Sequence, residues 1–343
     1  MNYQNTQLIG CDPEELRYTI NQTDMEHWVL PGGSLNVEVD SLYLDNASLQ
    51  RGRYGMAVQV KGAWPKGQVC VGLVLDAPDT ATINGCLCPA RSVQLYSEGS
   101  EISYRAPAGS TWLAFCAERE YFQQIAAELY GELLPIPATG MITVRPEETS
   151  GLQIAAAING TLEIAGSMNQ LPEIDQVMQT SEEAILREVL CAIHTDRRNV
   201  DRAESRSASR RRTLMSRAED YLLASKSDPF DLRAFARSVG TSERMLEYHF
   251  KHIYGVTPLA WMRSMKLNAI RDELKRHRVG GERISDIALR WGFTHFGRFS
   301  SDYRQLFGES PRDTQTRCRR RAPVRHPDPI CAKTGNQVGP RDK

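Results

Sequence analysis

Two helix-turn-helix patterns near the end of the sequence constrain the fold more than any other feature. The first spans residues 231–254 and the second spans residues 284–307. Each pattern has a short amphipathic segment, a glycine corner and a second amphipathic segment, as a helix-turn-helix unit requires. Two such units on one domain have a narrow physical use, because their recognition helices can enter successive major grooves of a duplex. The sequence therefore predicts double-stranded DNA as a partner.

In the first unit, Gly240 is expected at the sharp corner because glycine tolerates a positive φ. Thr241 or Ser242 is then placed to cap the second helix. The predicted inward residues of the unit are Leu232, Phe235, Ala236, Leu246, Phe250 and Ile253. The residues left on the outward face of the second helix, and predicted to meet base edges and phosphates, are Arg244, Glu247, Tyr248 and Lys251.

In the second unit, Gly292-Phe293 is expected to form the turn and Thr294 to cap the second helix. The predicted inward residues are Ile284, Ile287, Ala288, Trp291, Phe299, Tyr303, Leu306 and Phe307. The outward residues, which complete the predicted DNA-binding set, are His295, Phe296, Arg298, Ser300 and Ser301.

These outward residues suit different kinds of contact with DNA. Arg298 is the strongest candidate, because arginine pairs bidentately with guanine O6 and N7. Phe296 is either a contact to a thymine methyl group or a simple exposed apolar residue. His295 suits a capping or phosphate role as well as base reading.

A long helix is predicted over residues 258–276, between the two units, and Gly280-Gly281 is expected to end it. At 1.5 Å per residue this helix spans ~29 Å. Successive major grooves on one face of DNA recur at ~34 Å, so the helix is long enough to set the two units at groove spacing. Its candidate packing residues are Leu259, Met262, Met265, Leu267, Ile270 and Leu274.

The segment 213–315 resembles the DNA-binding domain of the AraC/XylS family of bacterial transcription regulators. The motif of the second unit is carried by Ile284, Ile287-Ala288, Trp291-Gly292-Phe293, Phe299, Tyr303, Phe307-Gly308 and Pro311. Residues 209–220 and the Gly-Phe-x-His-x-Gly form of the second unit look most like the ethanolamine-operon regulators. The resemblance implies a bihelical domain, activation through RNA polymerase and homodimerisation. In the first recognition helix, Glu247 and Tyr248 replace the amide or basic residues of many members, so target specificity does not carry over.

Charge divides the chain into two halves. Residues 1–200 hold 12 Lys and Arg against 25 Asp and Glu, and residues 201–343 hold the remaining 30 against 17. The halves therefore carry −13 and +13, as expected for an acidic module joined to a nucleic-acid module, although a solvated basic surface has the same signature. The predicted boundaries are 1–195 for an effector-sensing and dimerisation domain, 196–212 for a linker, 213–316 for the DNA-binding domain and 317–343 for a disordered basic tail.

The acidic half is predicted to be rich in strands over residues 25–117. Short alternating segments are separated by turn signals such as Pro31-Gly32-Gly33 and Pro107-Ala108-Gly109-Ser110. Residues 69–75 form a continuous apolar run, typical of a strand buried on both faces. The predicted fold class is thus α+β with two domains: a barrel- or sandwich-like sensor domain with helices, and an all-α domain.

Helices are expected from Arg119 onward. One of ~13 residues carries an apolar stripe, which either packs on its own domain or forms a dimer interface. The stripe consists of Ile185, Leu186, Val189, Leu190 and Ile193.

The sensor domain lacks the signs of a metal or catalytic site. His27 and His194 are its only histidines, and they lie far apart in sequence, which disfavours an imidazole metal site. The sequence therefore predicts no cofactor; a small amine and cobalamin are implied only by the ethanolamine resemblance. The aromatic residues that either line an effector pocket or fill a core are Trp28, Trp64, Tyr96, Tyr104 and Trp112.

Three interpretations follow. The first is an effector-controlled regulator. It is expected to be cytoplasmic, because no secretory signal or apolar run of ~20 residues is visible in the sequence. The second is an effector-independent DNA-binding or architectural protein whose N-terminal domain only dimerises. The third is an enzyme resembling the alkyl-transfer DNA-repair regulators. It is disfavoured because Cys88-Pro89 reverses their Pro-Cys-His order and has no adjacent histidine.

Overall fold

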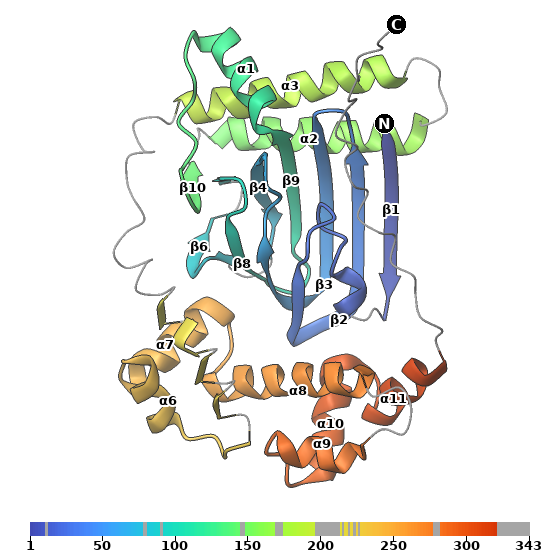
Figure 1. Cartoon of the computed structure of the whole chain (residues 1–343), viewed down its shortest axis with the longest axis vertical. Coiled ribbons are helices and arrows are strands. Elements are labelled where there is room, and N and C mark those ends of the chain that lie inside the picture. The colour runs from blue at the N-terminus through green and yellow to red at the C-terminus, as the bar shows by residue number, and fades with distance from the viewer. Residues whose placement is uncertain are drawn as a thin grey trace, which may run out of the picture.

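The computed structural model contains a curled antiparallel sheet covered by helices and a second group of helices below it (Figure 1). It describes residues 1–10, 13–77, 81–89, 92–144, 148–168, 174–195, 213–214, 216–218, 220–221, 224–225, 227–276 and 282–320. The strands are β1 (Asn2–Ile9), β2 (Glu26–Tyr43), β3 (Ala47–Ala63), β4 (Gln68–Asp76), β5 (Ala81–Ile83), β6 (Cys86–Cys88), β7 (Val93–Tyr96), β8 (Glu101–Ala106), β9 (Thr111–Glu118) and β10 (Met141–Val144).

The strands pair in the order β10-β7-β4-β9-β3-β8-β5-β6, and β2 joins β3 to β1. Along β4, Val69, Val71 and Leu73 pack in the core beneath the helices, whereas Cys70 and Val74 pack in the core on the concave side. The strand is therefore buried on both faces, which confirms the prediction from its continuous apolar run.

Three helices cover one face and end of the sheet: α1 (Arg119–Tyr130), α2 (Glu148–Met168) and α3 (Ile174–Thr195) (Figure 1). The apolar stripe predicted near the end of this region lies on α3, and all five of its side chains are fully buried in its own domain. The stripe therefore packs internally and is not available as a dimer interface. The helix has 22 residues, longer than expected.

Pro31-Gly32-Gly33 was expected to form a turn, and this prediction is wrong. The segment lies inside β2, where the pairing with β3 shifts register around Gly33. Gly33 has a φ of +79°, and a Cβ there would lie 2.0 Å from the carbonyl oxygen of Gly55. The local glycine signal thus marks a bulge and a close strand approach, because a long strand needs such a break to bend.

The C-terminal group contains α6 (Leu232–Val239), α7 (Glu243–Tyr254), α8 (Pro258–Arg276), α9 (Ile284–Arg290), α10 (Phe296–Phe307) and α11 (Pro311–Arg320). The predicted α+β two-domain fold class is confirmed. Residues 196–212, the predicted linker, lie outside the described residues, as do Gly280-Gly281 and 321–343. Because α11 continues through Arg320, residues 317–320 of the predicted tail are helical. Every helix in the described ranges is too short or too polar to cross a membrane.

Candidate nucleic-acid interface

The first unit consists of α6 and α7. Asp231 caps α6 by accepting from the Arg233 and Ala234 N–H groups at 2.9 and 3.1 Å. Gly240 ends α6 with a φ of 76°, as expected for the glycine corner. Of the two predicted caps for α7, Ser242 is the one observed, and its Oγ accepts from the Met245 N–H at 3.3 Å. The inward residues Leu246, Phe250 and Ile253 are buried.

The four outward residues of α7 are all exposed, as the predicted spacing requires: Arg244, Glu247, Tyr248 and Lys251. Tyr248 is 57% exposed, and its ring stacks on His252 at 5.6 Å between ring centroids. This face combines one acidic group with two basic groups.

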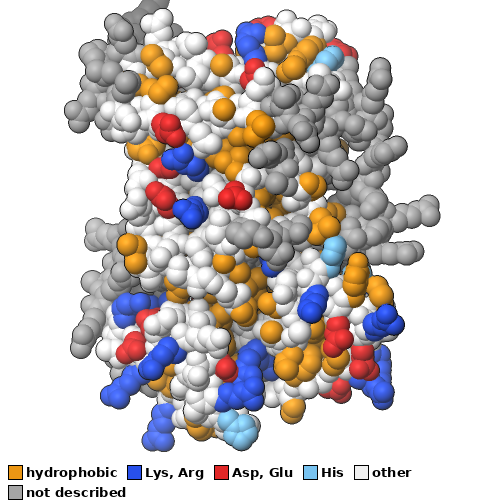
Figure 2. Space-filling model, turned by 180° about the vertical axis from the view of Figure 1, so that it is seen from behind, with side chains coloured by type: hydrophobic (Ala, Val, Ile, Leu, Met, Phe, Trp, Pro, Cys, Tyr) orange, Lys and Arg blue, Asp and Glu red, His pale blue; other side chains and the backbone are white. Residues whose placement is uncertain are grey.

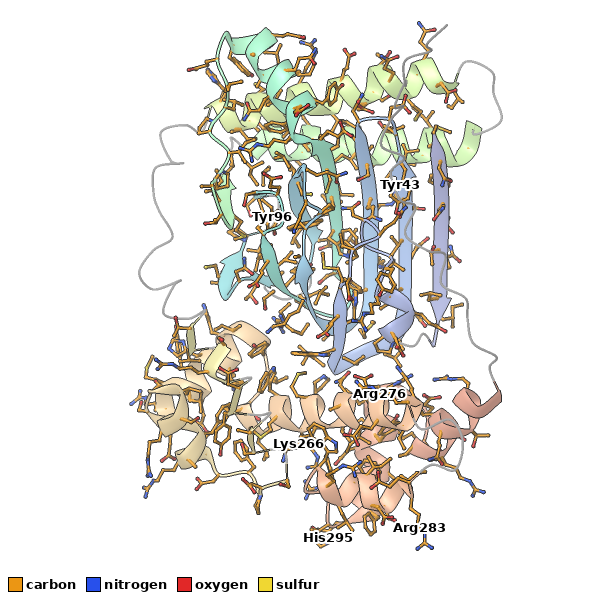
Figure 3. The ribbon with its side chains drawn as sticks, viewed as in Figure 1. Tyr43, Tyr96, Lys266, Arg276, Arg283 and His295 are labelled. Atoms are coloured by element: carbon orange, nitrogen blue, oxygen red, sulfur yellow. The ribbon has the colours of Figure 1, made fainter. Side chains whose placement is uncertain are left out.

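The second unit consists of α9 and α10, with Trp291 at its core. Trp291 is 6% exposed, and its Nε1 donates to Glu273 of α8 at 3.0 Å. Thr294 was expected to cap α10, but the capping position is His295, and its side chain makes no capping hydrogen bond. The five outward residues are exposed: His295, Phe296, Arg298, Ser300 and Ser301. Figure 3 shows His295 at the lower end of the molecule.

The two recognition helices are held on opposite parts of α8, which has 19 residues (Figure 1). At 1.5 Å per residue α8 spans about 29 Å, close to the ~34 Å groove repeat. Within α8 the expected packing of Leu259 is wrong, since it is 49% exposed. Trp261 takes that place instead and is fully buried against Phe250 and Tyr254.

Sequence reasoning missed the contacts that fix α10 and α11 on α8. Arg263 of α8 pairs with Asp302 of α10, and Arg271 pairs with Glu309 at 3.1 Å. Glu309 also accepts from Thr314 at 2.7 Å. The two ion pairs join residues 39 and 38 positions apart in sequence, so no local pattern predicts them.

Basic side chains gather on the helical part of the molecule in the view of Figure 2, whereas the sheet part shows fewer. Residues 235–317 match a family model described as a helix-turn-helix domain. The C-terminal region is an AraC/XylS-type helix-turn-helix domain.

Curated sequence relatives match this chain over less than a third of its length. A probable thc operon regulatory protein of Rhodococcus erythropolis is 39% identical over 94 residues, which cover 27% of this chain and 28% of the relative. The XylDLEGF operon transcriptional activator of Pseudomonas putida is 38% identical over 89 residues, or 26% of this chain and 28% of the relative. The chain therefore spans less than a third of each relative's length in these alignments.

Among solved structures, the AraC-like transcriptional activator CuxR is similar over 84% of this chain and 99% of its own, at 16% identity and a TM-score of 0.41. A regulator with an AraC-type DNA-binding domain from Chromobacterium violaceum matches 32% of this chain and 95% of its own, at 28% identity and a TM-score of 0.29.

The AraC-type domain is docked on the sheet through β2 and α8. Asn268 of α8 accepts from the Val29 N–H at 3.0 Å and donates to the Val29 carbonyl at 2.9 Å. Leu30 and Ala57 from the sheet are buried in the same core as α6 and α7. In addition, Thr82 donates to the Ile253 carbonyl near the end of α7 at 3.2 Å. β2 is therefore bonded to α8, the helix against which both helix-turn-helix units pack.

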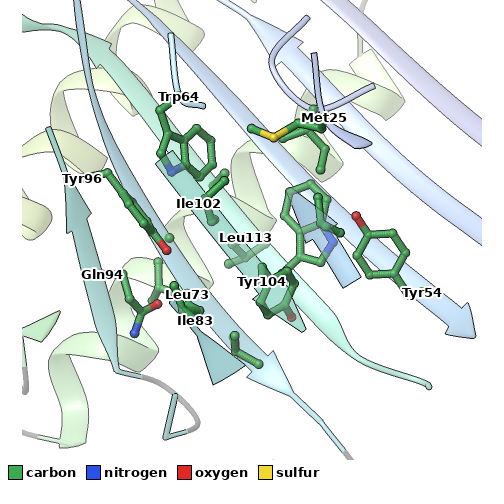
Figure 4. A pocket seen from close by; sticks show the side chains of 16 residues that line it. Met25, Tyr54, Trp64, Leu73, Ile83, Gln94, Tyr96, Ile102, Tyr104 and Leu113 are labelled. Carbon is green, nitrogen blue, oxygen red and sulfur yellow. The ribbon is translucent and has the colours of Figure 1, made fainter. Parts of the chain in front are cut away.

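The concave side of the sheet has a cavity of about 50 Å³ (Figure 4). Four of the five aromatic residues singled out in the sequence line it: Trp64, Tyr96, Tyr104 and Trp112. Trp28 does not; it packs on the core of the first unit, and Lys61 lies 5.5 Å from its ring. Gly52 makes room for Trp112, because a Cβ at Gly52 would lie 2.2 Å from the indole. The N-terminal domain thus has a small, mostly apolar cavity that these aromatic side chains line.

Proposed function

We propose that the protein is a sequence-specific, DNA-binding transcriptional regulator controlled by a small molecule bound to the N-terminal domain. The observation that carries the proposal is the pair of exposed recognition faces, on α7 and α10, held on one helix of about groove-repeat length. The residues proposed to meet DNA are Arg244, Glu247, Tyr248, Lys251, His295, Phe296, Arg298, Ser300 and Ser301.

Activation is the proposed sign of regulation. It is supported by the relative named as a transcriptional activator, and RNA polymerase is then the protein partner that the family resemblance implies. Homodimerisation is proposed on the same resemblance. Because the α3 stripe is buried within its own domain, a dimer has to use another surface of residues 1–195.

The ethanolamine-operon branch stays a prediction from residues 209–220 and the motif around His295. Part of that first segment lies outside the described residues, and the two sequence relatives reported above are named for other operons. A small amine and cobalamin therefore stay tied to that resemblance.

The burial and the raised pKa of the Cys88 thiol conflict with the alkyl-transfer alternative. This thiol is 6% exposed, and burial raises its pKa to about 11, an effect that the Ser92 hydrogen bond only partly offsets. A thiol with such a pKa is almost entirely protonated at neutral pH, whereas the thiolate is the nucleophile.

The test is to sequence genomic DNA fragments captured by the purified full-length protein at near-physiological salt. We expect a few strong sites with a shared motif upstream of one operon. Capture without a motif, lost steeply as salt rises, would instead indicate binding driven by phosphates and an architectural role.

A further inference from the structure

The two helix-turn-helix units have separate apolar cores, which meet along α8. Trp261 and Met265 of α8 belong to the core that contains α6 and α7. Leu267 and Ile270 belong to the core that contains α9 and α10. Lys266 therefore lies at the point on α8 where one core gives way to the other, and Figure 3 shows it between the two units. Because long helices bend, α8 alone fixes the orientation of the units less firmly than two connections would.

A second connection between the units begins at Lys266. This residue is 7% exposed, and its Nζ donates to the carbonyl oxygen of Asp228 at 3.1 Å. Burial lowers the pKa of Lys266, and the nearby Asp228 partly offsets this effect. A buried ammonium group needs such a partner, because an unpaired charge is very costly to bury. The lysine therefore attaches the segment 227–231, which leads into α6, to the middle of α8.

The same segment also touches the second unit, at the corner formed by Gly292. In Figure 1 the segment runs below α8 towards α9. A Cβ at Gly292 would lie 2.9 Å from the carbonyl oxygen of Ser227, closer than side chains normally approach. Gly292 also has a φ of +80°, so the turn and the close contact both favour glycine. The backbone of segment 227–231 is therefore packed directly on the corner of the second unit.

Segment 227–231 is in turn fixed to the first unit. The ring of Phe230 packs edge-to-face against Phe235 of α6, with 6.2 Å between the ring centroids. Asp231 accepts hydrogen bonds from two N–H groups in the first turn of the same helix. The segment therefore joins the two units directly, in addition to their shared attachment to α8. Together with Lys266 and Gly292 it forms an inter-unit bridge.

We propose that Lys266 is a positioning residue: with segment 227–231 it fixes the angle between the two recognition helices, and so selects operators whose two half-sites stand at one spacing. One added base pair rotates a half-site by about 35° around the duplex, since a turn takes about 10–10.5 base pairs. Two units in a fixed orientation cannot follow that rotation, whereas two loosely joined units can. The inference rests on the proposed function, to which it adds a buried residue that sets the spacing of the operator.

The experiment uses the captured operator and two versions of it, with one base pair inserted or deleted between the half-sites. Fluorescence anisotropy measures the affinity of the full-length protein for all three duplexes. We expect the parent protein to bind the altered duplexes about tenfold more weakly, as much as one mismatched base pair commonly costs. Equal binding to all three duplexes would overturn the proposal.

Two substitutions at Lys266 separate positioning from stability. Lys266→Met keeps the length of the side chain and removes the donor, so the preference for one spacing should fall to about twofold. Lys266→Arg keeps a charge and a donor, and it should retain most of the preference of the parent. If Lys266→Met binds all three duplexes more weakly by one common factor, Lys266 acts through stability alone and the proposal is overturned.

Gly292→Ala tests the other contact of the bridge. Its new methyl would press on the Ser227 carbonyl group, and it should also reduce the preference for one spacing to about twofold. Gly308→Ala is the matched control: Gly308 has a similar φ of +72°, but a Cβ there has no neighbour within 4 Å among the described residues. It introduces the same kind of backbone strain and should keep the preference of the parent. An equal loss of the preference in both variants would contradict a role for the Ser227 contact.

Residual dipolar couplings test the bridge without DNA. Measured on the backbone amides of deuterated, weakly aligned full-length protein, they report the relative orientation of α7 and α10. We expect one alignment tensor to fit both helices in the parent protein and two different tensors to be needed in Lys266→Met. A single shared tensor in both proteins would overturn the bridge.

The couplings also separate the positioning role of Lys266 from the proposed function. A specific operator that is bound equally well at every spacing removes the positioning role alone and leaves the regulator standing. The absence of any specific operator removes the regulator, while a tensor that splits in Lys266→Met still supports the bridge.

Discussion

The two helix-turn-helix units share one backbone plan and differ at the start of their recognition helices. α7 begins with a Ser242 side-chain cap and carries Glu243 in its first turn. α10 begins at His295 without a side-chain cap and has no acidic residue in its first turn. Because the N-terminus of a helix attracts anions, the start of α10 suits a phosphate better than the capped start of α7. We infer that the second unit contributes more of the affinity for DNA.

The units also differ in what supports them. The core of the first includes Leu30 and Ala57 from the sheet, so it is shared with the sensor domain. The second is tied to α8 by the pairs Arg263–Asp302 and Arg271–Glu309. A change in the sensor domain is therefore expected to reach the first unit directly through packing, and α8 through Asn268.

The largest expected effect is on the stability of the second unit. Trp291→Ala should lower the free energy of unfolding by ~3–5 kcal/mol, the usual cost of deleting a buried tryptophan. Trp291→Phe is the matched control; it keeps an aromatic ring but loses the hydrogen bond to the Glu273 carboxylate, at about 1.5–3 kcal/mol. Urea unfolding followed by circular dichroism measures both. If Trp291→Ala unfolds like the parent, Trp291 does not anchor this unit.

The next effect compares DNA contacts of the two units. Arg298→Ala on α10 should weaken specific binding by ~1–3 kcal/mol and relax the preference at one base pair. Arg244→Ala on α7 should cost less, because the exposed Glu247 carboxylate on the same helix face repels phosphates and weakens the contact there. Fluorescence anisotropy on the captured operator measures both affinities. Equal losses of DNA affinity in the two variants would contradict the proposed difference between the units.

A smaller effect on stability is expected from changes at the N-terminal capping positions of α7 and α10. Ser242→Ala removes the observed cap of α7 and should destabilise the protein by about 1 kcal/mol. His295→Ala should change stability little, because the His295 side chain makes no capping bond. Thermal unfolding of the two variants in the same buffer gives the comparison. If His295→Ala lost more stability than Ser242→Ala, the assignment of the side-chain cap to α7 would be contradicted.

Local sequence signals predicted most of the AraC-type domain. Gly240, Ser242 and the apolar spacing of α7 each specify local geometry, and the structure agrees with them. The same reasoning failed for Leu259 and Trp261, because which face of α8 is buried depends on what packs against it from α7.

The sensor domain was harder to predict, because its strands pair residues that are distant in sequence. The bulge at Gly33 depends on Gly55 in the neighbouring strand, and the pairing of β1 with the end of β2 has no local signal. The cavity is lined by residues of strands β3, β4, β5, β7, β8 and β9, so the sequence could offer only a set of aromatic residues. That four of them meet around one space is a property of the pairing.

The smallest effect concerns Glu247, the acidic residue on the outward face of α7. Its carboxylate is exposed, so its repulsion of a phosphate is weak and screened by salt. Glu247→Gln should therefore tighten binding to all sequences by about two- to fivefold at low salt, the size of a surface charge interaction. The gain should shrink as the salt concentration rises.

The same substitution separates phosphate repulsion from base reading. A glutamate that accepts from cytosine N4 is specific for that base, whereas a glutamine pairs with adenine. If Glu247 only repels phosphate, the ranking of operator variants stays the same in Glu247→Gln while every affinity rises. A switch of preference from cytosine to adenine at one position would instead place Glu247 in the major groove. The first unit would then act mainly in selecting the site, and the second in holding it.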